Sequence, residues 1–397
     1  MNLEPIGNLV SRVKQCDPVD LGREWISYVD IAAVDNGAKR IVAGQRVRAK
    51  TAPSRARQLI RGQDVLLSTV RPNLNAVAVV PKELDGQIAS TGFCVLRPDA
   101  ARLDPRYLFY FVQTPGFIRR LTQIASGASY PAVTDSDVFE TAIPLPALPE
   151  QKRIAQLLEQ ADRLRRTRRY ALELSDTFLP AAFLEVFGDP ATNPKGFPME
   201  RVETVFSKQR EGAKCGPFGS ALKKNEYVSA GIPVWTMDNV GENEFRENGC
   251  LYVSPKKFEQ LKAYDAQNGD ILVSRAGTVG RMAIVRTNRE RSIIHSNIIR
   301  LSLDSSQCLP VFFTVLMTFF AARVGRLKRG QEDAYTFMNT GRLAELKIPL
   351  PPLAMQSRFA ALVDRHEQLR ASQREALRQA EHLFQSLLHR VFATTEA

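Results

Sequence analysis

The residues closest to a nuclease pattern stand near the end of the chain. Glu345 and Lys347 flank one apolar residue, and this ExK spacing would place both groups on one side of a strand. There they could hold a divalent metal and stabilise charge on a phosphate. The matching earlier segment, Glu140-Thr141-Ala142, has no lysine, and no acidic partner stands upstream. Because so short a match arises often by chance, we predict no nuclease site here.

Other catalytic and metal-binding patterns are absent from the sequence. It contains no GxGxxG after an expected strand, no GxxxxGK[ST] phosphate loop and no (D/N/S)PP(Y/F) motif of amino-methyltransferases. The five cysteines form no CxxC pair and the four histidines no HxxxH pair, so neither a zinc site nor a disulfide framework is indicated. His366 stands among apolar helix positions, where we expect a packed, hydrogen-bonded side chain. We therefore predict no catalytic residue, metal or cofactor in this chain.

Positive charge is the strongest signal in the composition. The chain has 54 Lys and Arg against 42 Asp and Glu, which gives a net charge of +12. Such a balance favours a polyanionic partner, and nucleic acid before a membrane surface. Basic residues crowd between Ala38 and Gln63 with few acids among them. A surface that faces phosphates and a solvated loop face are both compatible with this run.

Candidate DNA contacts come from the basic run, from two expected hairpins and from the loops before two IPLP segments. Arginine and lysine neutralise phosphates, and arginine can also read base edges. In the first half of the chain the candidates are Lys39, Arg40, Arg46, Arg48, Arg71, Asn73 and Tyr130. In the second half they are Lys223, Lys224, Arg275, Thr278, Arg281, Lys328, Arg329 and Tyr335.

The elements that must position these residues occur twice. Residues 143–190 and 348–397 align without a gap at an offset of 205, and each reads as an apolar strand, a proline-rich elbow and a long helix. Upstream of each copy, Asp64–Val80 and Asn268–Val285 read as two apolar β runs flanking a polar turn. A repeat of this length indicates a duplicated domain rather than a solenoid.

The two long helices have matching apolar positions. The expected seam of the first is Ile154, Leu157, Ala161, Leu164, Ala171 and Phe178, and that of the second is Phe359, Leu362, His366, Leu369, Ala376 and Leu383. Heptad-like spacing of this kind predicts that the helices pack on each other, in an antiparallel sense. Pro180 should kink the first helix or restart it.

These motifs together resemble the specificity (S) subunit of type I restriction-modification systems. The similarity rests on IPLPALPEQKRIAQLL at Ile143–Leu158, on its degenerate repeat IPLPPLAMQSRFAALV at Ile348–Val363, on the linker FGDPATNPKGFP and on the two hairpin segments. It extends over the whole chain.

The resemblance implies both a fold and a role. The fold is mixed α/β (α+β), with two similar target-recognition domains and two long antiparallel helices that form a coiled coil, related by a pseudo-two-fold internal duplication. We assign residues 1–146 to the first target-recognition domain, 147–190 to the central helix, 191–351 to the second domain and 352–397 to the C-terminal helix. Each domain is expected to read one half of a split double-stranded DNA sequence, and the helices to set the gap.

The implied partners carry the chemistry. A non-catalytic specificity subunit is expected to bind two modification subunits, which use S-adenosylmethionine to methylate adenine, and restriction subunits that need ATP and Mg²⁺. The helix starts are the implied docking surface, with Gln151 and Arg153 in the first copy and Gln356 and Arg358 in the second. Met355 departs from the pattern, because the first copy has Glu150 there. No signal peptide is evident, and the most apolar run is about a dozen residues where a membrane span needs about 20, so we expect a cytoplasmic protein.

Two other classes of function stay open at this point. The chain could be an enzyme, either a nuclease or a restriction-modification polypeptide, and cleavage of DNA by the purified protein with Mg²⁺ would indicate this. It could also be an interaction protein whose basic charge is incidental, and a weak, salt-insensitive affinity for duplex DNA would favour that.

Overall fold

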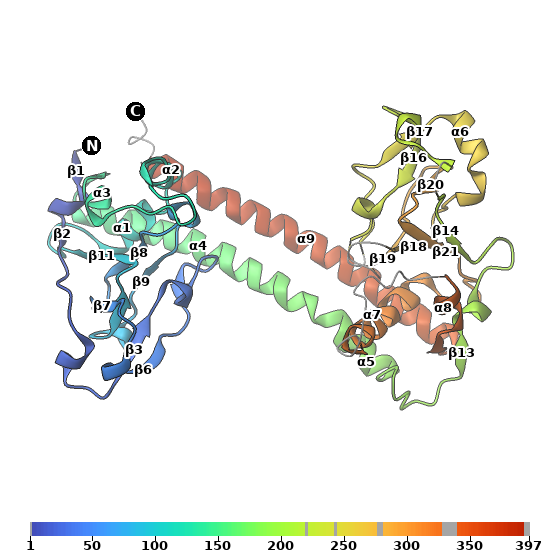
Figure 1. Cartoon of the computed structure of the whole chain (residues 1–397), viewed down its shortest axis with the longest axis horizontal. Coiled ribbons are helices and arrows are strands. Elements are labelled where there is room, and N and C mark those ends of the chain that lie inside the picture. The colour runs from blue at the N-terminus through green and yellow to red at the C-terminus, as the bar shows by residue number, and fades with distance from the viewer. Residues whose placement is uncertain (1, 219–220, 242–243, 276–280, 328–339, 393–397) are drawn as a thin grey trace. The chain divides into compact units, whose positions relative to one another are not determined.

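The computed structural model describes residues 2–218, 221–241, 244–275, 281–327 and 340–392. The chain forms two compact units. Unit 1 consists of Met1–Ala171 together with Gln373–Ala397, and unit 2 is Leu172–Ser372. Unit 1 therefore combines an N-terminal segment with the second half of the C-terminal helix, whereas unit 2 is one continuous segment that contains the first half of that helix (Figure 1).

The strands of unit 1 are β1 (Leu3–Pro5), β2 (Val10–Ser11), β3 (Trp25–Val29), β4 (Val34–Asp35), β5 (Arg40–Ile41), β6 (Gln45–Arg48), β7 (Ala56–Leu59), β8 (Val65–Ser68), β9 (Val77–Val79), β10 (Ile88–Ser90), β11 (Phe93–Pro98) and β12 (Ala142–Pro144). Those of unit 2 are β13 (Met199–Arg201), β14 (Ala213–Cys215), β15 (Tyr227–Val228), β16 (Ile232–Trp235), β17 (Leu251–Val253), β18 (Ile271–Ser274), β19 (Met282–Ile284), β20 (Ile293–Ile294), β21 (Ile298–Leu301) and β22 (Lys347–Pro349).

The α-helices are α1 (Pro105–Phe111), α2 (Pro115–Ile124), α3 (Asp135–Phe139), α4 (Leu148–Asp176), α5 (Phe178–Phe187), α6 (Pro255–Gln260), α7 (Pro310–Leu327), α8 (Thr340–Glu345) and α9 (Leu353–Phe392). The most apolar run of the sequence, Val311 to Ala322, lies within α7, and Phe312 and Phe313 are fully buried there. Among the described residues, no helix is both long and apolar enough to cross a membrane.

Unit 1 is built in layers around one antiparallel hairpin. Strands β8 and β9 pair in the sheet β2-β11-β8-β9, which confirms the expected strand-turn-strand motif. Because side chains alternate along a strand, Val65 and Leu67 face a core shared with α1, whereas Leu66 faces the second sheet, β6-β3-β10-β7. The central sheet is thus covered by helices on one face and by a sheet on the other.

Unit 2 repeats this arrangement. Strands β18 and β19 pair in the sheet β14-β21-β18-β19, and the second sheet has the order β15-β17-β16-β20. Ile271 and Val273 pack toward α7, and Leu272 packs toward Trp235 on the second sheet. The mixed α/β fold and the internal duplication that the sequence predicted are therefore confirmed.

The IPLP segments close each repeat. β12 pairs with β1, and β22 pairs with β13, both antiparallel (Figure 1). The prolines of these strands stand at the edge of two-stranded ribbons, where the missing N–H costs no ladder bond. Glu345 ends α8 whereas Lys347 begins β22, so the ExK residues do not share one strand.

The helix break expected at Pro180 occurs three residues earlier. α4 ends at Asp176 and α5 begins at Phe178, so Pro180 lies in the first turn of the second helix, where its missing N–H is tolerated. In unit 2 the first half of α9 runs antiparallel to the end of α4 and the start of α5. Asp176 pairs with Arg370, and two residues later Phe178 stacks on the earlier His366. His366 is buried and hydrogen-bonded to the Ser175 carbonyl at 3.0 Å, as predicted.

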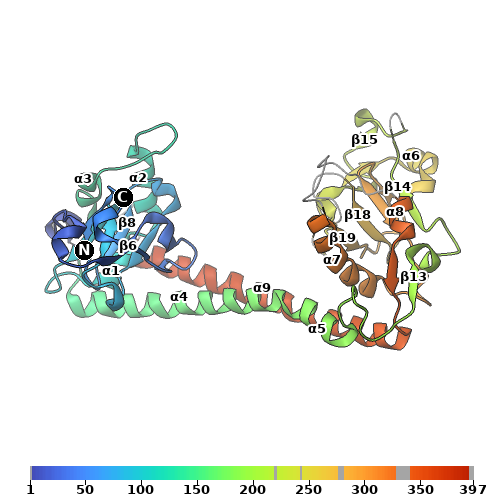
Figure 2. The same cartoon turned by 60° about the horizontal axis from the view of Figure 1, so that its bottom comes forward.

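The antiparallel relation also holds in unit 1. The end of α9 lies beside α1 and α4, as Figures 1 and 2 both show. Arg165 of α4 covers the Phe384 ring of α9, and Arg169 pairs with Glu381 at 2.7 Å. Residues further along α4 therefore contact residues earlier in α9, as in an antiparallel pair. Within each unit, α4 or α5 and part of α9 therefore share one core.

The predicted seam is wrong in several positions. Leu157, Leu164, Leu369 and Leu383 are exposed. The buried residues of α4 are instead Gln151, Ile154, Ala155, Leu158, Ala161 and Asp162, and those of the second half of α9 are Ala380, Phe384, Leu388 and Phe392. These buried residues form a stripe with the 3.6-residue period of a helix that packs on a globular core. Such a stripe is wider than a coiled-coil seam, because the helix covers α1 and the central sheet and not only a partner helix.

Candidate nucleic-acid interface

A tryptophan flanked by two arginines lies on strands β3 and β6. Trp25 faces Arg48 and Ser27 faces Arg46 in the strand register, so all four residues project from the same side of the pair. The guanidinium carbons of Arg46 and Arg48 lie 4.8 Å and 5.1 Å from the Trp25 ring centroid. Both arginines are exposed, as the prediction of a phosphate-facing surface requires.

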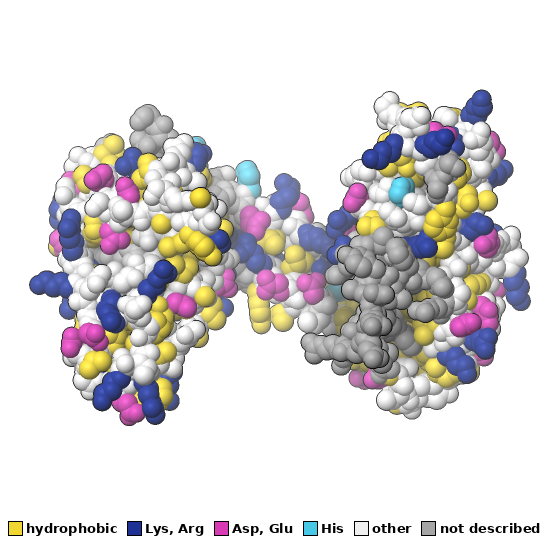
Figure 3. All heavy atoms as spheres, viewed as in Figure 1, with side chains coloured by type: hydrophobic (Ala, Val, Ile, Leu, Met, Phe, Trp, Pro, Cys, Tyr) yellow, Lys and Arg dark blue, Asp and Glu magenta, His cyan; other side chains and the backbone are white. Residues whose placement is uncertain are grey.

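The basic run is less uniform in space than in sequence. Arg40 is exposed and faces Asp35 across the β4–β5 pair, and Arg48 lies 3.8 Å from Glu24. Arg57 likewise lies 3.5 Å from Asp17. Figure 3 shows basic and acidic side chains interspersed on the visible face of unit 1. Acidic side chains from other segments of unit 1 thus lie close to several cations of the basic run.

Lys39 departs from the prediction because its side chain points into unit 1. Its Nζ donates to the backbone carbonyl of Asn75 and to the Asn75 Oδ1, 3.3 Å away. Burial and, to a smaller extent, the nearby Arg165 charge lower the pKa of Lys39 to about 8, although Asp35 opposes the shift. Lys39 therefore ties two connections of unit 1 together and is not a surface cation.

Arg71 and Tyr130 come together at the β8–β9 connection. The Arg71 guanidinium lies over the Tyr130 ring, 4.7 Å from its centroid, and both side chains are exposed. The backbone N–H of Arg71 donates to the carbonyl of Pro131 at 2.7 Å, which fastens the Tyr130 loop to the hairpin. Asn73 is exposed two residues further along the same connection.

The matching connection of unit 2 presents another arginine. The Arg275 guanidinium lies 4.6 Å from the centroid of the exposed Phe218 ring. Phe218 could not be selected from the sequence, because it follows β14, far from the hairpin in the chain. The Gly216-Pro217 dipeptide before it is a weak signal of a change in chain direction. Arg281 is exposed at the start of β19, and its backbone N–H donates to Ser274 Oγ at 3.0 Å.

The remaining candidates of unit 2 fall into two groups. Lys223 and Lys224 are exposed and lie together at a short turn, where the N–H of Lys223 donates to Glu226 at 2.7 Å. Thr278, Lys328, Arg329 and Tyr335 lie outside the described residues.

A buried aspartate anchors each hairpin. Asp64 accepts from the N–H of Arg61 at 2.7 Å and from two nitrogens of Arg97 at 2.9 Å and 2.7 Å. Asp270, its equivalent, accepts from the N–H of Gln267 at 2.7 Å and from Ser302 Oγ at 2.6 Å. Since a buried carboxylate is stable only when paired, these contacts hold the first strand of each hairpin in place.

The two glutamines assigned to docking have a different role. Gln151 and Gln356 have no exposed surface, so their side chains offer a partner subunit nothing to contact. Gln151 accepts from the N–H of Asp104 at 2.9 Å and donates to the carbonyls of Arg102 and Pro146, each at 2.9 Å. The docking assignment of both amides is therefore corrected. Each amide joins the start of its long helix to the proline-rich elbow before it and to the neighbouring domain.

The second glutamine makes the same three bonds 205 residues later. Gln356 accepts from the N–H of Leu309 at 2.8 Å and donates to the carbonyls of Gln307 and Pro351 at 3.0 Å and 2.9 Å. The neighbouring Arg153 and Arg358 are both exposed on their helices. Arg153 forms a two-pronged pair with Glu150 at 2.8 Å and 2.7 Å.

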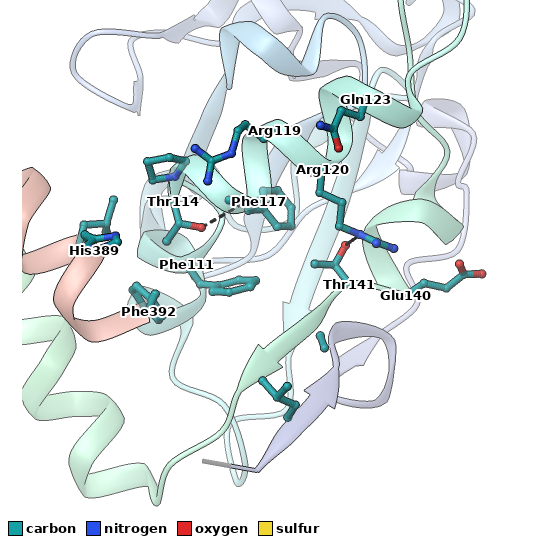
Figure 4. Close-up of a pocket in the computed structure, with 15 residues that line it drawn as sticks. Phe111, Thr114, Phe117, Arg119, Arg120, Gln123, Glu140, Thr141, His389 and Phe392 are labelled. Carbon is teal, nitrogen blue, oxygen red and sulfur yellow. Dashed lines mark hydrogen bonds between the residues drawn. The ribbon is translucent and has the colours of Figure 1, made fainter. Parts of the chain in front are cut away.

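Unit 1 has a hollow of about 470 Å³ next to α2 and the end of α9. Figure 4 shows the side chains that line it. The rings of Phe111, Phe117 and Phe392 line it together with Arg120, whose Nε donates to Thr141 Oγ1 at 3.2 Å. None of the predicted DNA contacts that the structure describes lines this hollow.

Comparison with known families follows this geometry. The family model of the type I restriction modification DNA specificity domain matches residues 48–174 and again residues 215–381. The chain therefore belongs to the type I restriction-modification DNA specificity family. Each match contains a hairpin, its buried aspartate, the clamping glutamine and much of a long helix.

Individual relatives agree with this membership. The type I restriction enzyme MjaVIII specificity subunit of Methanocaldococcus jannaschii is 23% identical over 72% of this chain and 69% of its own length. A chain from a structural study of complex assembly and conformational transition of the type I R-M system has a TM-score of 0.63 and 28% identity, covering 98% of this chain and 96% of that chain. The S subunit from M. genitalium shares the fold at 15% identity, with a TM-score of 0.60, 98% coverage of this chain and 96% of its own.

Proposed function

We propose that this chain is the non-catalytic specificity subunit of a type I restriction-modification complex. Residues 1–146 and 191–351 are the two target-recognition domains, and each reads one half of a bipartite double-stranded DNA target. Residues 147–190 and 352–397 are the helices that set the gap between the half-sites and dock the modification subunits.

The observation that carries this proposal is a duplicated frame with two different surfaces. Both units contain the same hairpin register, the same anchoring aspartate and the same three glutamine bonds. The surfaces differ, because unit 1 has Trp25 with two arginines on strands β3 and β6, whereas unit 2 has exposed lysines at the Lys223 turn before β15. One scaffold with two unlike surfaces suits a protein that recognises two unlike sequences.

DNA binding would divide between affinity and specificity. Arg40, Arg46, Arg48, Lys223 and Lys224 are exposed cations suited to phosphates, whose neutralisation releases counterions and makes binding sensitive to salt. Arg71, Asn73, Tyr130, Arg275 and Arg281 lie at the hairpin connections, and we assign them to the base-reading side together with Thr278, Lys328, Arg329 and Tyr335. Two linked half-sites would raise the effective affinity beyond that of either domain.

The chemistry of methylation and cleavage would reside on partner subunits. Two modification subunits would bring S-adenosylmethionine, and restriction subunits would bring ATP and Mg²⁺. The exposed Arg153 and Arg358 remain our candidates for contact with the modification subunits. The complex would act in the cytoplasm, where it meets both host and foreign DNA.

A map of N6-methyladenine over the genome of a host cell tests this function. The host would express this chain with its neighbouring modification subunit, and in parallel the modification subunit alone. We expect a split motif with a fixed gap only when this chain is present. No new methylation, despite soluble and co-purifying subunits, would overturn the proposal, and cleavage of DNA by the purified chain with Mg²⁺ would favour the enzyme class instead.

A further inference from the structure

Each unit holds an exposed aromatic ring beneath an arginine. Tyr130 in unit 1 is 68% exposed and Phe218 in unit 2 is 56% exposed. Arg71 lies 4.7 Å from the first ring centroid and Arg275 lies 4.6 Å from the second. Two other rings that arginines cover, Phe384 and Phe258 beneath Arg165 and Arg291, are buried in cores. Trp25, beneath Arg46 and Arg48, is exposed at 38%.

The two pairs lie at matching hairpin connections but not at matching positions, because Arg275 aligns with Thr69: its N–H bond to the Asn297 carbonyl matches the bond from Thr69 to the Gly92 carbonyl. Arg71 lies in the connection between β8 and β9, and Arg275 in the connection between β18 and β19. Their rings come from unrelated segments, since Tyr130 stands between α2 and α3 whereas Phe218 follows β14. A simple inheritance of one residue pair by duplication therefore does not account for both.

The backbone fixes both pairs in position. Arg71 adopts a left-handed conformation with φ of +50°, which is costly for a non-glycine residue and typical of functional sites. Its N–H donates to the carbonyl of Pro131, directly after Tyr130, and the N–H of Arg275 donates to the carbonyl of Asn297 at 2.9 Å. Gly216 stands two residues before Phe218, and a Cβ there would lie 2.1 Å from the carbonyl oxygen of His295, so only glycine lets this segment approach so closely.

Stacking of this kind suits base reading. An arginine can donate two hydrogen bonds to O6 and N7 of guanine in the major groove, the commonest specific contact between proteins and DNA. Freezing a long side chain normally weakens binding, and a ring beneath the guanidinium reduces that cost. The Trp25 surface differs, because it lies on a strand pair rather than a hairpin connection and one of its arginines already faces Glu24.

We propose that Arg71 on Tyr130 and Arg275 on Phe218 each read one guanine, the first in one half-site and the second in the other. This inference rests on the proposed function and adds to it the base that each pair selects. It also makes Phe218 a specificity-determining residue.

The experiment uses the complex of this chain with its modification subunits. N6-methyladenine maps would be recorded for the wild type and for Arg71→Ala, Arg275→Ala, Tyr130→Ala, Tyr130→Phe and Phe218→Ala. Methylation of duplexes that differ at single positions would give the discrimination for each. Arg46→Ala is the matched control for Arg71→Ala, since each removes an exposed, ring-stacked arginine. Thermal unfolding would establish that each variant is folded.

We expect Arg71→Ala to lose roughly 10- to 100-fold discrimination for one G·C pair in one half-site, leaving the other half-site unchanged. Arg275→Ala should do the same in the other half-site. Tyr130→Phe should keep the wild-type motif, while Tyr130→Ala and Phe218→Ala relax the same positions as their arginines. Arg46→Ala should weaken methylation without changing the motif.

Two contrary results have different meanings. In the first, the wild type has a split motif and both arginine variants keep it, with only weaker methylation. This would mean that the two arginines contact phosphates, and it would overturn this inference while leaving the proposed function intact. A folded wild-type complex with no split motif would overturn the proposed function and this inference together.

Discussion

At the scale of single residues, the glutamine of the helix start is the clearest structural device. Its amide satisfies one backbone N–H and two carbonyls that would otherwise be buried without partners, and it does so in both units. The sequence showed that Gln151 and Gln356 align. It did not show whether they face a partner or the domain, because burial depends on where the elbow folds.

Replacing Gln151 with leucine should therefore destabilise unit 1. The change keeps the volume close but leaves three buried backbone groups without partners, and we expect a loss of about 3 kcal/mol of unfolding free energy in this unit. Hydrogen exchange of residues 102–111 would measure the local effect. Arg153→Ala on the same helix is the control, and an equal loss in both variants would contradict the clamp.

Lys39 gives unit 1 a dependence on pH. Its pKa falls from 10.5 to about 8 on folding, mainly through burial, so the unfolded chain binds more protons between these values. Stability of unit 1 should therefore rise as the pH increases from about 8 toward 10. Urea unfolding of the wild type and of Lys39→Met at pH 7 and pH 9.5 would test this. The wild type should gain stability relative to the variant, and parallel behaviour would refute the assignment.

At the scale of elements, adjacent leucines of α4 separate the observed core from the expected seam. Leu158 is fully buried against α1, and Leu157 is exposed. Leu158→Ala should cost about 2–5 kcal/mol, as other large-to-small core changes do, and Leu157→Ala less than about 1 kcal/mol. Thermal unfolding of the two variants decides the matter. A larger loss of unfolding free energy from Leu157→Ala than from Leu158→Ala would contradict this account and support the heptad-like seam.

Sequence patterns predicted the hairpins, the IPLP strands and the long helices because local forces determine them. The hairpins of Asp64–Val80 and Asn268–Val285, the IPLP strands and the restart at Pro180 all follow from alternation, turns and proline. Helix α3 was missed inside an expected polar loop, although Thr134 and Asp137 form a capping box that could have revealed it.

What the sequence could not give depends on contacts between distant segments. Lys39 turns inward because Asn75 accepts a hydrogen bond from it. The Phe218 ring, which follows β14, contacts Arg275, which follows β18. Met355, where the first copy has Glu150, is half-buried against the unit 2 core, so the missing acid is accompanied by an apolar contact. None of these partners is adjacent in the sequence.

At the scale of the whole molecule, the net charge of +12 should make DNA binding strongly dependent on salt. Binding to a target duplex would be measured between 50 and 200 mM salt for the wild type and for the double variant Arg46→Ala, Arg48→Ala. We expect the slope of log affinity against log salt to fall by about 0.9 for each phosphate contact removed. Identical slopes would remove the Trp25 surface from the DNA interface.

The central claim is that two independent domains each read one half of the target. The measurement that tests it most directly is an exchange of residues 1–142 for the corresponding segment of another family member, followed by a methylation map of the complex. The account predicts that one half-site changes while the other half-site and the gap stay the same. If both half-sites change together, or neither does, the two units do not read DNA independently and the account is wrong.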